Sequence, residues 1–379
     1  MRSSADVVVV GGGVIGCSVG YYLAARGLRV TVLERGTVGG QASSAATGLL
    51  APFKLLAKSD DSYLALQRAS LALFPALVAE IEATTGMTVE YHETGTLRLA
   101  QEKQVAALRS WAALWSDAGV SMEVVQGDRL ASLEPGLAPS YRVAVSIPGE
   151  PQVRAVSFMA AMAQAARLAG VTLLEGCQVI GVERSGARAV AVRTAHGDTL
   201  GCSHVVLAAG AWSGGASGWL GLEVPVRPLQ GQSLLLPQAG PAPVRHTLFG
   251  EGIYIVPRAD KTLVVGSTYD EVGFDCQVTP DGVARLKASA RRLVPALSTV
   301  EVLQAGAGLR PRTPDSRPIL GPAPLWENVT LATGHNGFGV LLSPLTGRIV
   351  ADVVMTGQLA DIARPFTIDR FHASITSAV

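Results

Sequence analysis

Charged residues are scarce in this sequence, and their signs nearly cancel. Only 16% of the 379 residues are Asp, Glu, Lys or Arg, and the net charge is +1 at pH 7. Proteins that hold nucleic acid or an anionic membrane by charge carry a basic patch or a large positive excess. The composition therefore argues against both kinds of partner. The 48% share of hydrophobic residues favours a large buried core over disorder.

Cysteine and histidine are sparse as well. The four cysteines are Cys17, Cys177, Cys202 and Cys276, and no two of them form a C-x-x-C pair. This spacing indicates neither a zinc site nor a disulfide framework. The six histidines lie too far apart in the sequence to suggest a metal site. We expect a protein of the reducing cytoplasm that binds no metal.

The N-terminal region has one long run without charge. Residues 7–25 contain no charged residue and Arg2 precedes them, as in a signal peptide or a membrane anchor. Three consecutive glycines, residues 11–13, interrupt the run, and each glycine costs a helix about 1 kcal/mol relative to alanine. The four valines before them suit a buried parallel strand, so we expect no membrane span.

The same run carries a nucleotide-binding pattern. Gly11, Gly13 and Gly16 form G-x-G-x-x-G between a strand-like and a helix-like segment, and Glu34 follows a second apolar run. In such a motif the glycines permit a tight turn, a close approach of the backbone to a pyrophosphate, and helix–strand packing. The helix N-terminus favours phosphate, and the Glu34 carboxylate can accept hydrogen bonds from ribose hydroxyls. The pattern predicts a dinucleotide-binding strand–helix–strand unit.

Strand patterns typical of this unit return after an excursion of different character, and the simplest explanation is an inserted domain. The predicted class is α/β (α+β overall), with a Rossmann-like domain that a sheet-rich domain interrupts. The Rossmann-like domain is assigned to residues 1–86, 148–223 and 308–379. The sheet-rich domain is assigned to residues 87–147 and 224–307.

Three segments near the expected site have local signals. Residues 36–48 are small and uncharged, which indicates a loop against a ligand or, alternatively, a mobile linker. Apolar periodicity predicts one amphipathic helix over residues 62–83. Residues 341–355 predict a helix whose first turn contains Ser343 and Pro344, because proline is favoured there.

Several separated segments together resemble the D-amino-acid-oxidase-like FAD enzymes, a family that includes sarcosine oxidases, D-amino-acid dehydrogenases and, as the most similar group, glycine oxidases. The resemblance extends from one end of the chain to the other. The matching segments are Gly11 to Glu34, Ser43 to Gly48, Tyr254 to Arg258, Gly308 to Pro311, Asp315 with Pro318 to Gly321, and Gly334 to Pro344.

The resemblance implies an FAD domain under a substrate domain, with FAD extended and its pyrophosphate at the first glycine turn. It implies that Glu34 holds the ribose, Ser43 and Ser44 the pyrophosphate or flavin, and the main chain of Val179 the adenine. Because residues 43–48 include no histidine and residues 305–345 no cysteine, we expect noncovalent FAD. The residues implied to contact FAD are Gly11, Gly13, Val14, Ile15, Gly16, Glu34, Arg35, Ser43, Ser44, Ala45, Thr47, Gly48, Leu49, Val179, Ala209, Gly210, Trp212, Gly308, Arg310, His335, Asn336, Gly337, Phe338, Gly339, Val340 and Leu341.

Arg310 and Tyr254 are the implied catalytic residues, because matching positions in glycine oxidases bind the substrate carboxylate. A guanidinium can hold a carboxylate with two parallel hydrogen bonds, and this would present the α-carbon to the flavin. The alternative for Arg310 is a structural ion pair with Asp315. Arg258, Arg312 and Arg317 are weaker candidates for the carboxylate site.

The sequence departs from the glycine oxidase pattern at two places. Relatives commonly carry an arginine shortly after the Gly-His pair, whereas here Gly334-His335 is followed by Asn336-Gly337-Phe338-Gly339. Gly252 stands where a histidine sits in some relatives. Both departures imply a roomier and less polar pocket.

The implied reaction is FAD-dependent oxidative deamination of a small amino acid or amine, such as glycine, a D-amino acid or the N-methyl amino acid sarcosine. Its products would be an oxo acid, ammonia or an amine, and hydrogen peroxide, with O2 as electron acceptor. Kinship also suggests thiamine biosynthesis, and we expect a homo-oligomer. Three alternatives stay open: a dehydrogenase that reduces a quinone or partner subunit, an FAD-binding subunit of a hetero-oligomeric oxidase, and an NAD-dependent dehydrogenase with the same glycine motif.

Overall fold

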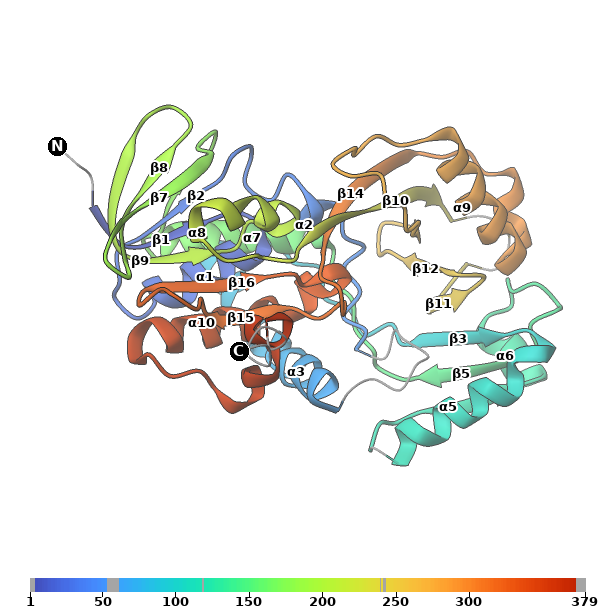
Figure 1. Ribbon diagram of the computed structural model, residues 1–379. Coiled ribbons are helices and arrows are strands. Elements are labelled where there is room, and N and C mark those ends of the chain that lie inside the picture. Colours follow the sequence, from blue (N-terminus) through green and yellow to red (C-terminus); the bar gives the residue numbers. More distant parts are fainter. Residues whose placement is uncertain (1–3, 53–60, 118, 239, 241–242, 373–379) are drawn as a thin grey trace.

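Two eight-stranded sheets organise the chain, one in each lobe of the molecule (Figure 1). The computed structural model describes residues 4–52, 61–117, 119–238, 240 and 243–372. The second sheet takes its strands from residues 96–147 and 227–312, on either side of a segment that belongs to the first sheet. The five-segment division into domains stays a proposal; β14 of the second sheet continues to Arg312, beyond the proposed boundary at residue 307.

The first sheet contains the predicted nucleotide-binding unit. Its strand order is β15-β16-β9-β1-β2-β6, with the β7–β8 hairpin beside β9, and its central strands are parallel. The bounds are β1 Ser4–Val10, β2 Val30–Leu33, β6 Thr172–Leu174, β7 Val179–Ser185, β8 Arg188–Thr194, β9 Thr199–Leu207, β15 Ile319–Pro322 and β16 Val329–Thr333. Alternate valines of β1 belong to the apolar clusters on opposite faces of the sheet. This burial on both faces explains the uninterrupted apolar run.

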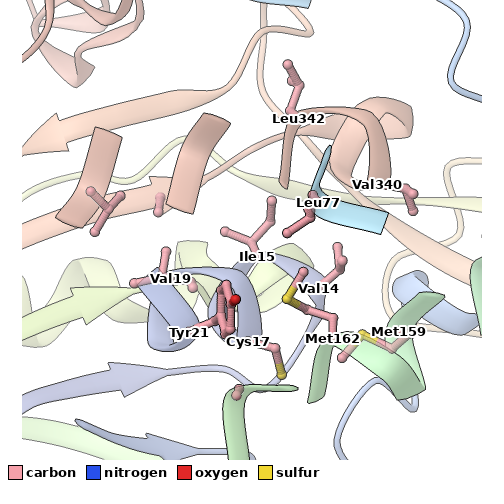
Figure 2. Close-up of a cluster of buried hydrophobic side chains, with 14 of the residues drawn as sticks. Val14, Ile15, Cys17, Val19, Tyr21, Leu77, Met159, Met162, Val340 and Leu342 are labelled. Atoms are coloured by element: carbon pink, nitrogen blue, oxygen red, sulfur yellow. The ribbon is translucent and has the colours of Figure 1, made fainter. Parts of the chain in front are cut away.

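Helices cover one face of this sheet and enclose the larger apolar cluster. The bounds are α1 Val14–Ala24, α2 Ala42–Ala45, α3 Asp61–Leu71, α4 Phe74–Thr85, α7 Ala155–Leu168 and α10 Gly339–Thr356. The short helix α8 Ser217–Leu220 packs in the apolar cluster of the opposite face, to which Leu220 belongs. Figure 2 shows side chains of α1 among Leu77 of α4, Met159 and Met162 of α7, and Leu342 of α10. Cys17 is fully buried in this cluster and all four cysteines are free, so Cys17 is a packing residue.

The second sheet is almost wholly antiparallel, with the order β14-β10-β13-β12-β11-β3-β5-β4 and one parallel pair, β11–β3. The bounds are β3 Thr96–Ala100, β4 Glu123–Gln126, β5 Val143–Ile147, β10 Arg227–Pro237, β11 Thr247–Gly250, β12 Ile253–Pro257, β13 Thr262–Gly266 and β14 Gln304–Arg312. The helices of this lobe are α5 Val105–Asp117, α6 Asp128–Leu133 and α9 Pro280–Leu293. In Figure 1, β10 and β14 lie on the side of this sheet toward the first lobe.

Two helix predictions were wrong in their bounds, both because of proline. The single helix expected over residues 62–83 is two helices, α3 and α4, since Pro75 in the first turn of α4 has no N–H to continue the helix. The last long helix begins at Gly339, before the expected start, and Pro344 lies inside it. Pro344 has no N–H to donate to the Val340 carbonyl four residues earlier. That carbonyl instead accepts a hydrogen bond from the Ser343 hydroxyl at 2.9 Å.

Among the described residues, two helical stretches are apolar and long enough to cross a membrane. The first, residues 62–85, spans both α3 and α4, and 44% of its most apolar window is buried. The second, residues 336–356, includes α10, and 67% of its most apolar window is buried. Buried core helices meet the same criterion, so these stretches are weak evidence for a span.

Candidate active site

Two adjoining hollows lie where the first sheet ends and the second lobe begins. The first hollow is lined by the start of α1, residues 42–49, β10, β12, β14 and residues 332–340, and its unfilled space is about 1130 Å³, open solvent included. The second hollow, about 1210 Å³ on the same measure, is lined by the ends of β1 and β2, residues 177–180 and residues 207–219. They share Gly13 and Ser43 in their walls. Together they form space for an extended ligand on both sides of the glycine turn.

The structure brings most of the predicted residues to these walls. The first hollow is lined by Gly13, Val14, Ile15, Ser43, Ala45, Thr47, Gly48, Leu49, Gly210, Tyr254, Gly308, Arg310, His335, Asn336, Gly337, Phe338, Gly339 and Val340. The second is lined by Gly11, Gly13, Glu34, Arg35, Ser43, Val179, Ala209, Gly210 and Trp212.

Three predicted residues lie elsewhere. Gly16 packs against the turn, where a side chain would bring a Cβ within 1.8 Å of the Gly11 carbonyl oxygen. Ser44 faces a separate small hollow on the α7 side. Leu341 is buried in the helical core.

The glycine turn is closed by side chains from two later segments. Gly11 has φ +109°, a backbone conformation that favours glycine, and a Cβ there would be 2.4 Å from the Ala208 carbonyl oxygen. The Glu34 carboxylate accepts hydrogen bonds from the Gly12 and Gly36 N–H groups, both at 2.8 Å. The Ser43 hydroxyl accepts from the N–H of Val14, in the first turn of α1, at 2.9 Å. The turn and the start of α1 are thereby fixed next to both hollows.

The walls fit the FAD that the resemblance implies. The second hollow has an aromatic wall, because Arg35 lies 3.7 Å over the Trp212 ring, on which Phe274 also stacks at 5.5 Å between centroids. In the first hollow, the Asn336 Oδ1 atom is buried without a hydrogen-bond partner in the described part of the chain. Such an atom costs about 1–3 kcal/mol, and an N–H of a flavin ring would supply the missing donor. An aromatic base and a hydrogen-bonding ring therefore suit the two ends of this site.

Within the described part of the chain, the acceptors that Arg310 finds are all neutral. Its Nη2 donates to the Ser267 hydroxyl at 2.6 Å, and its Nη1 donates to the Gln230 and Thr268 carbonyls, both at 3.2 Å. The alternative ion pair with Asp315 is wrong, because Asp315 accepts from Arg370 at 2.8 Å. These bonds use three of the five guanidinium N–H groups, and the positive charge is left without an anion among the described residues.

Two of the three weaker arginine candidates, Arg258 and Arg312, have structural partners instead. Arg258 donates to Gln152 at 2.6 Å, to the Val153 carbonyl at 3.0 Å and to the Thr47 carbonyl, and burial lowers its pKa to about 10. It fixes the 42–49 loop instead of lining the hollow. Arg312 forms an ion pair with Glu271.

The first hollow is poor in groups that titrate. Among its described lining residues these are Tyr254, Arg310 and His335. His335 is buried and shares a hydrogen bond with Thr346 at 3.1 Å, and burial lowers its pKa to about 3. It is therefore neutral at pH 7, which leaves Arg310 as the charged member of the set.

Sequence reasoning missed several polar and small residues of this wall. Gly231, Gln232 and Ser233 of β10, and Ser267 after β13, all line the first hollow. An isolated glycine inside a strand pattern signals a close approach of another group, so Gly231 carried a usable signal. Ser267 carried none.

Known proteins resemble the chain over nearly its whole length. Residues 6–353 match the model of a family described as FAD dependent oxidoreductase. The glycine oxidase of Geobacillus kaustophilus is 37% identical, over 96% of this chain and 97% of that protein. A bifunctional protein ThiO/ThiG of Trichormus variabilis is 34% identical over 97% of this chain and 55% of its own length. The crystal structure of the Geobacillus kaustophilus glycine oxidase superposes with a TM-score of 0.91, at 35% identity over 97% of this chain and 98% of that one.

Proposed function

This chain belongs to the D-amino-acid-oxidase family of FAD-dependent oxidoreductases, and from that premise we propose that it oxidises the amine of a small α-amino acid, with glycine as the first candidate substrate. Family membership decides for FAD over the NAD that the glycine motif alone left open. The similarity to glycine oxidases supports the substrate class.

The first lobe holds the cofactor in this proposal. The glycine turn and the first turn of α1 receive the pyrophosphate, Glu34 the ribose, and residues 335–340 the isoalloxazine ring, all without a covalent bond. When bound, FAD supplies the redox chemistry by accepting two electrons and a proton from the substrate. The N-terminus of α10, an 18-residue helix, would favour the negative charge that reduction brings.

The second lobe holds the substrate. Arg310 binds the carboxylate through the two N–H donors that its protein contacts leave, which is the number that a bidentate pair requires. Tyr254, buried in the same wall, orients the carboxylate from β12. Holding this end of the substrate fixes the α-carbon against the cofactor side of the hollow, which lowers the barrier through orientation.

The described lining of the hollow contains no carboxylate, and its one imidazole, that of His335, is buried and hydrogen-bonded to Thr346. The substrate therefore enters the reaction with a neutral amine. R-CH(NH2)-COO⁻ loses two electrons and two protons in total and becomes R-C(=NH)-COO⁻. Hydrolysis of this imino acid by water gives the oxo acid and ammonia. Transfer of the two electrons and two protons to O2 gives H2O2.

One observation carries the proposal: the Arg310 guanidinium lies in the wall of the first hollow, and its partners among residues that the structure describes are all neutral. A partly buried cation without an anion favours an anionic ligand. Glycine, sarcosine, D-alanine and D-proline are mixed anaerobically with the holoprotein, and loss of the flavin absorbance at about 450 nm is followed. Bleaching by at least one of them is expected. Bleaching by none would refute the proposal.

Admission of air then separates oxidase from dehydrogenase. An oxidase regains its absorbance quickly and yields one H2O2 for each substrate consumed. Fast bleaching without peroxide, together with reduction of an added quinone or dye, would assign the dehydrogenase alternative.

A further inference from the structure

Glycines replace side chains on the face of the second sheet that lines the first hollow. Gly231 of β10 lies opposite Gly308 of β14, and both line the hollow. Gly266 of β13 lies opposite Tyr254 of β12. Because paired residues of neighbouring strands share a face, Arg310 and Tyr254, the two residues proposed to bind the carboxylate, each lie beside glycines on that face.

The Arg310 guanidinium rests on one of these glycines. A Cβ on Gly231 would lie 2.1 Å from the Arg310 Nη2 and 2.4 Å from its Cζ and Nη1. These separations are far below any tolerable contact, so even the smallest side chain at residue 231 would displace the charged group. The Tyr254 ring has the same relation to Gly266, where a Cβ would lie 2.9 Å from Cε2 and 3.1 Å from the hydroxyl oxygen.

Two further side chains contact the guanidinium. Ser267 accepts from Nη2 at 2.6 Å, and the Arg310 Cζ lies 4.6 Å from the centroid of the Tyr269 ring. We propose that Gly231, Ser267 and Tyr269 form a cradle that positions the Arg310 guanidinium for the substrate carboxylate, with the absent side chain of Gly231 as its decisive element. This inference rests on the proposed function.

The cradle explains why a flexible side chain can act as a precise ligand. A long arginine side chain loses conformational freedom when it binds, unless it is already held. Here three protein acceptors and one aromatic ring hold it in advance. A carboxylate then meets donors that are already in place, and its position relative to the cofactor is set by β10 and β14.

Gly231→Ala tests the cradle, with Gly306→Ala as the matched control. Gly306 lies on β14 two residues before Gly308, and a Cβ there would have no atom within 4 Å. Neither glycine has a positive φ, so alanine strains neither backbone. The atoms that Gly231→Ala would displace are the end of a flexible side chain, and the variant should fold.

The readout is the dissociation constant of glycolate, a glycine analogue with hydroxyl in place of amine, taken from the flavin absorbance change. Gly231→Ala should raise this constant and the KM for the amino acid by about 10- to 100-fold, because displacing a binding group by about 1 Å costs up to about that factor. The FAD content of both variants should equal that of the parent. The glycolate dissociation constant of Gly306→Ala should lie within about twofold of the parent value. Ser267→Ala adds no volume at the site, and it should weaken glycolate binding by a few-fold.

A double-mutant cycle shows whether the effect passes through Arg310. In the Arg310→Ala background, Gly231→Ala should cause no further loss, because the displaced group is absent. Additive losses would overturn the cradle, and so would a Gly231→Ala variant that matches the Gly306→Ala control. A parent that binds glycolate but oxidises no amino acid would refute the proposed function, while the glycolate constants would still decide on the cradle.

Discussion

Removal of Arg310 is the most direct test of how this site would recognise its substrate. In Arg310→Ala the carboxylate of a bound amino acid would lose its cationic partner inside a hollow that offers no other positive charge among its described lining residues. Loss of one partner of a desolvated charge pair costs about 2–5 kcal/mol. That range corresponds to a rise of about 30-fold to several thousand-fold in the dissociation constant of the substrate.

Arg310→Lys refines this expectation. Lysine keeps the charge but replaces the planar fork by a single ammonium on a flexible four-carbon stem, which reaches less far than the guanidinium nitrogens. It would also be unable to reach all three acceptors, the Ser267 hydroxyl and the carbonyls of Gln230 and Thr268. We expect its affinity for glycolate to lie between those of the parent and of Arg310→Ala, and nearer to the latter.

Flavin content and spectrum provide the internal control. The hydrogen bonds of Arg310 go to β10 and to residues 267–268 of the second lobe, so neither variant should lose FAD. Glycolate titration of each purified holoprotein gives the dissociation constant, and steady-state assays give KM and kcat. An unchanged glycolate affinity in Arg310→Ala would refute the assignment of this residue as the carboxylate ligand.

Three further predictions concern other parts of the site and its support. Glu34→Gln should weaken FAD binding by about 1–3 kcal/mol, because the carboxylate that accepts from two backbone N–H groups and would accept from the ribose loses one of its acceptor oxygens. Titration of the apoprotein with FAD measures this loss, and kcat at saturating FAD should be unchanged. Arg258→Gln should lower the free energy of unfolding by about 2–3 kcal/mol and weaken FAD retention, because the charged tether to Thr47 is lost; an unchanged melting temperature would contradict this. Burial raises the pKa of Glu150, beside Arg98, to about 7 from 4.5. The folded state thus binds this proton more tightly, and stability falls by about 3 kcal/mol as pH rises from about 4.5 to 7. Glu150→Gln should remove that loss, visible as a gain in melting temperature over the parent at pH 8 and not at pH 4.

The nucleotide-binding unit could be predicted from sequence because its signals are local. The valines of β1, the glycine turn and Glu34 all lie within 31 residues, from Ser4 to Glu34. Burial of β1 on both faces leaves an apolar run that needs no partner to be recognised. The bounds of α4 and α10 were harder, because Pro75 and Pro344 occupy different positions in their helices. Whether a proline starts a helix or lies inside one depends on whether a nearby group donates a hydrogen bond to the carbonyl that the proline leaves without one, as the Ser343 hydroxyl does here.

Partners of charged residues were not accessible in the same way. Arg310 and Asp315 are five positions apart, which made an ion pair reasonable. The chain instead leaves β14 after Arg312 and carries Asp315 to Arg370, 55 residues further on. Only the packing of the C-terminal segment determines that choice. The role of Gly231 likewise depends on the register between β10 and β14, which no local pattern specifies.

The two lobes must also be fixed relative to each other, since the substrate ligands come from one and the cofactor walls from the other. Gly308 of β14 lies so close to α2 that a Cβ there would be 2.6 Å from the Ala45 Cβ. Arg258, directly after β12, donates to the Thr47 carbonyl of the same loop. Strand β14 carries Arg310 and β12 carries Tyr254, so both proposed ligands stand on strands that touch the cofactor loop itself. The separation between carboxylate and flavin is therefore set by direct contacts of residues 45–47, and not by the long connections between the sheets.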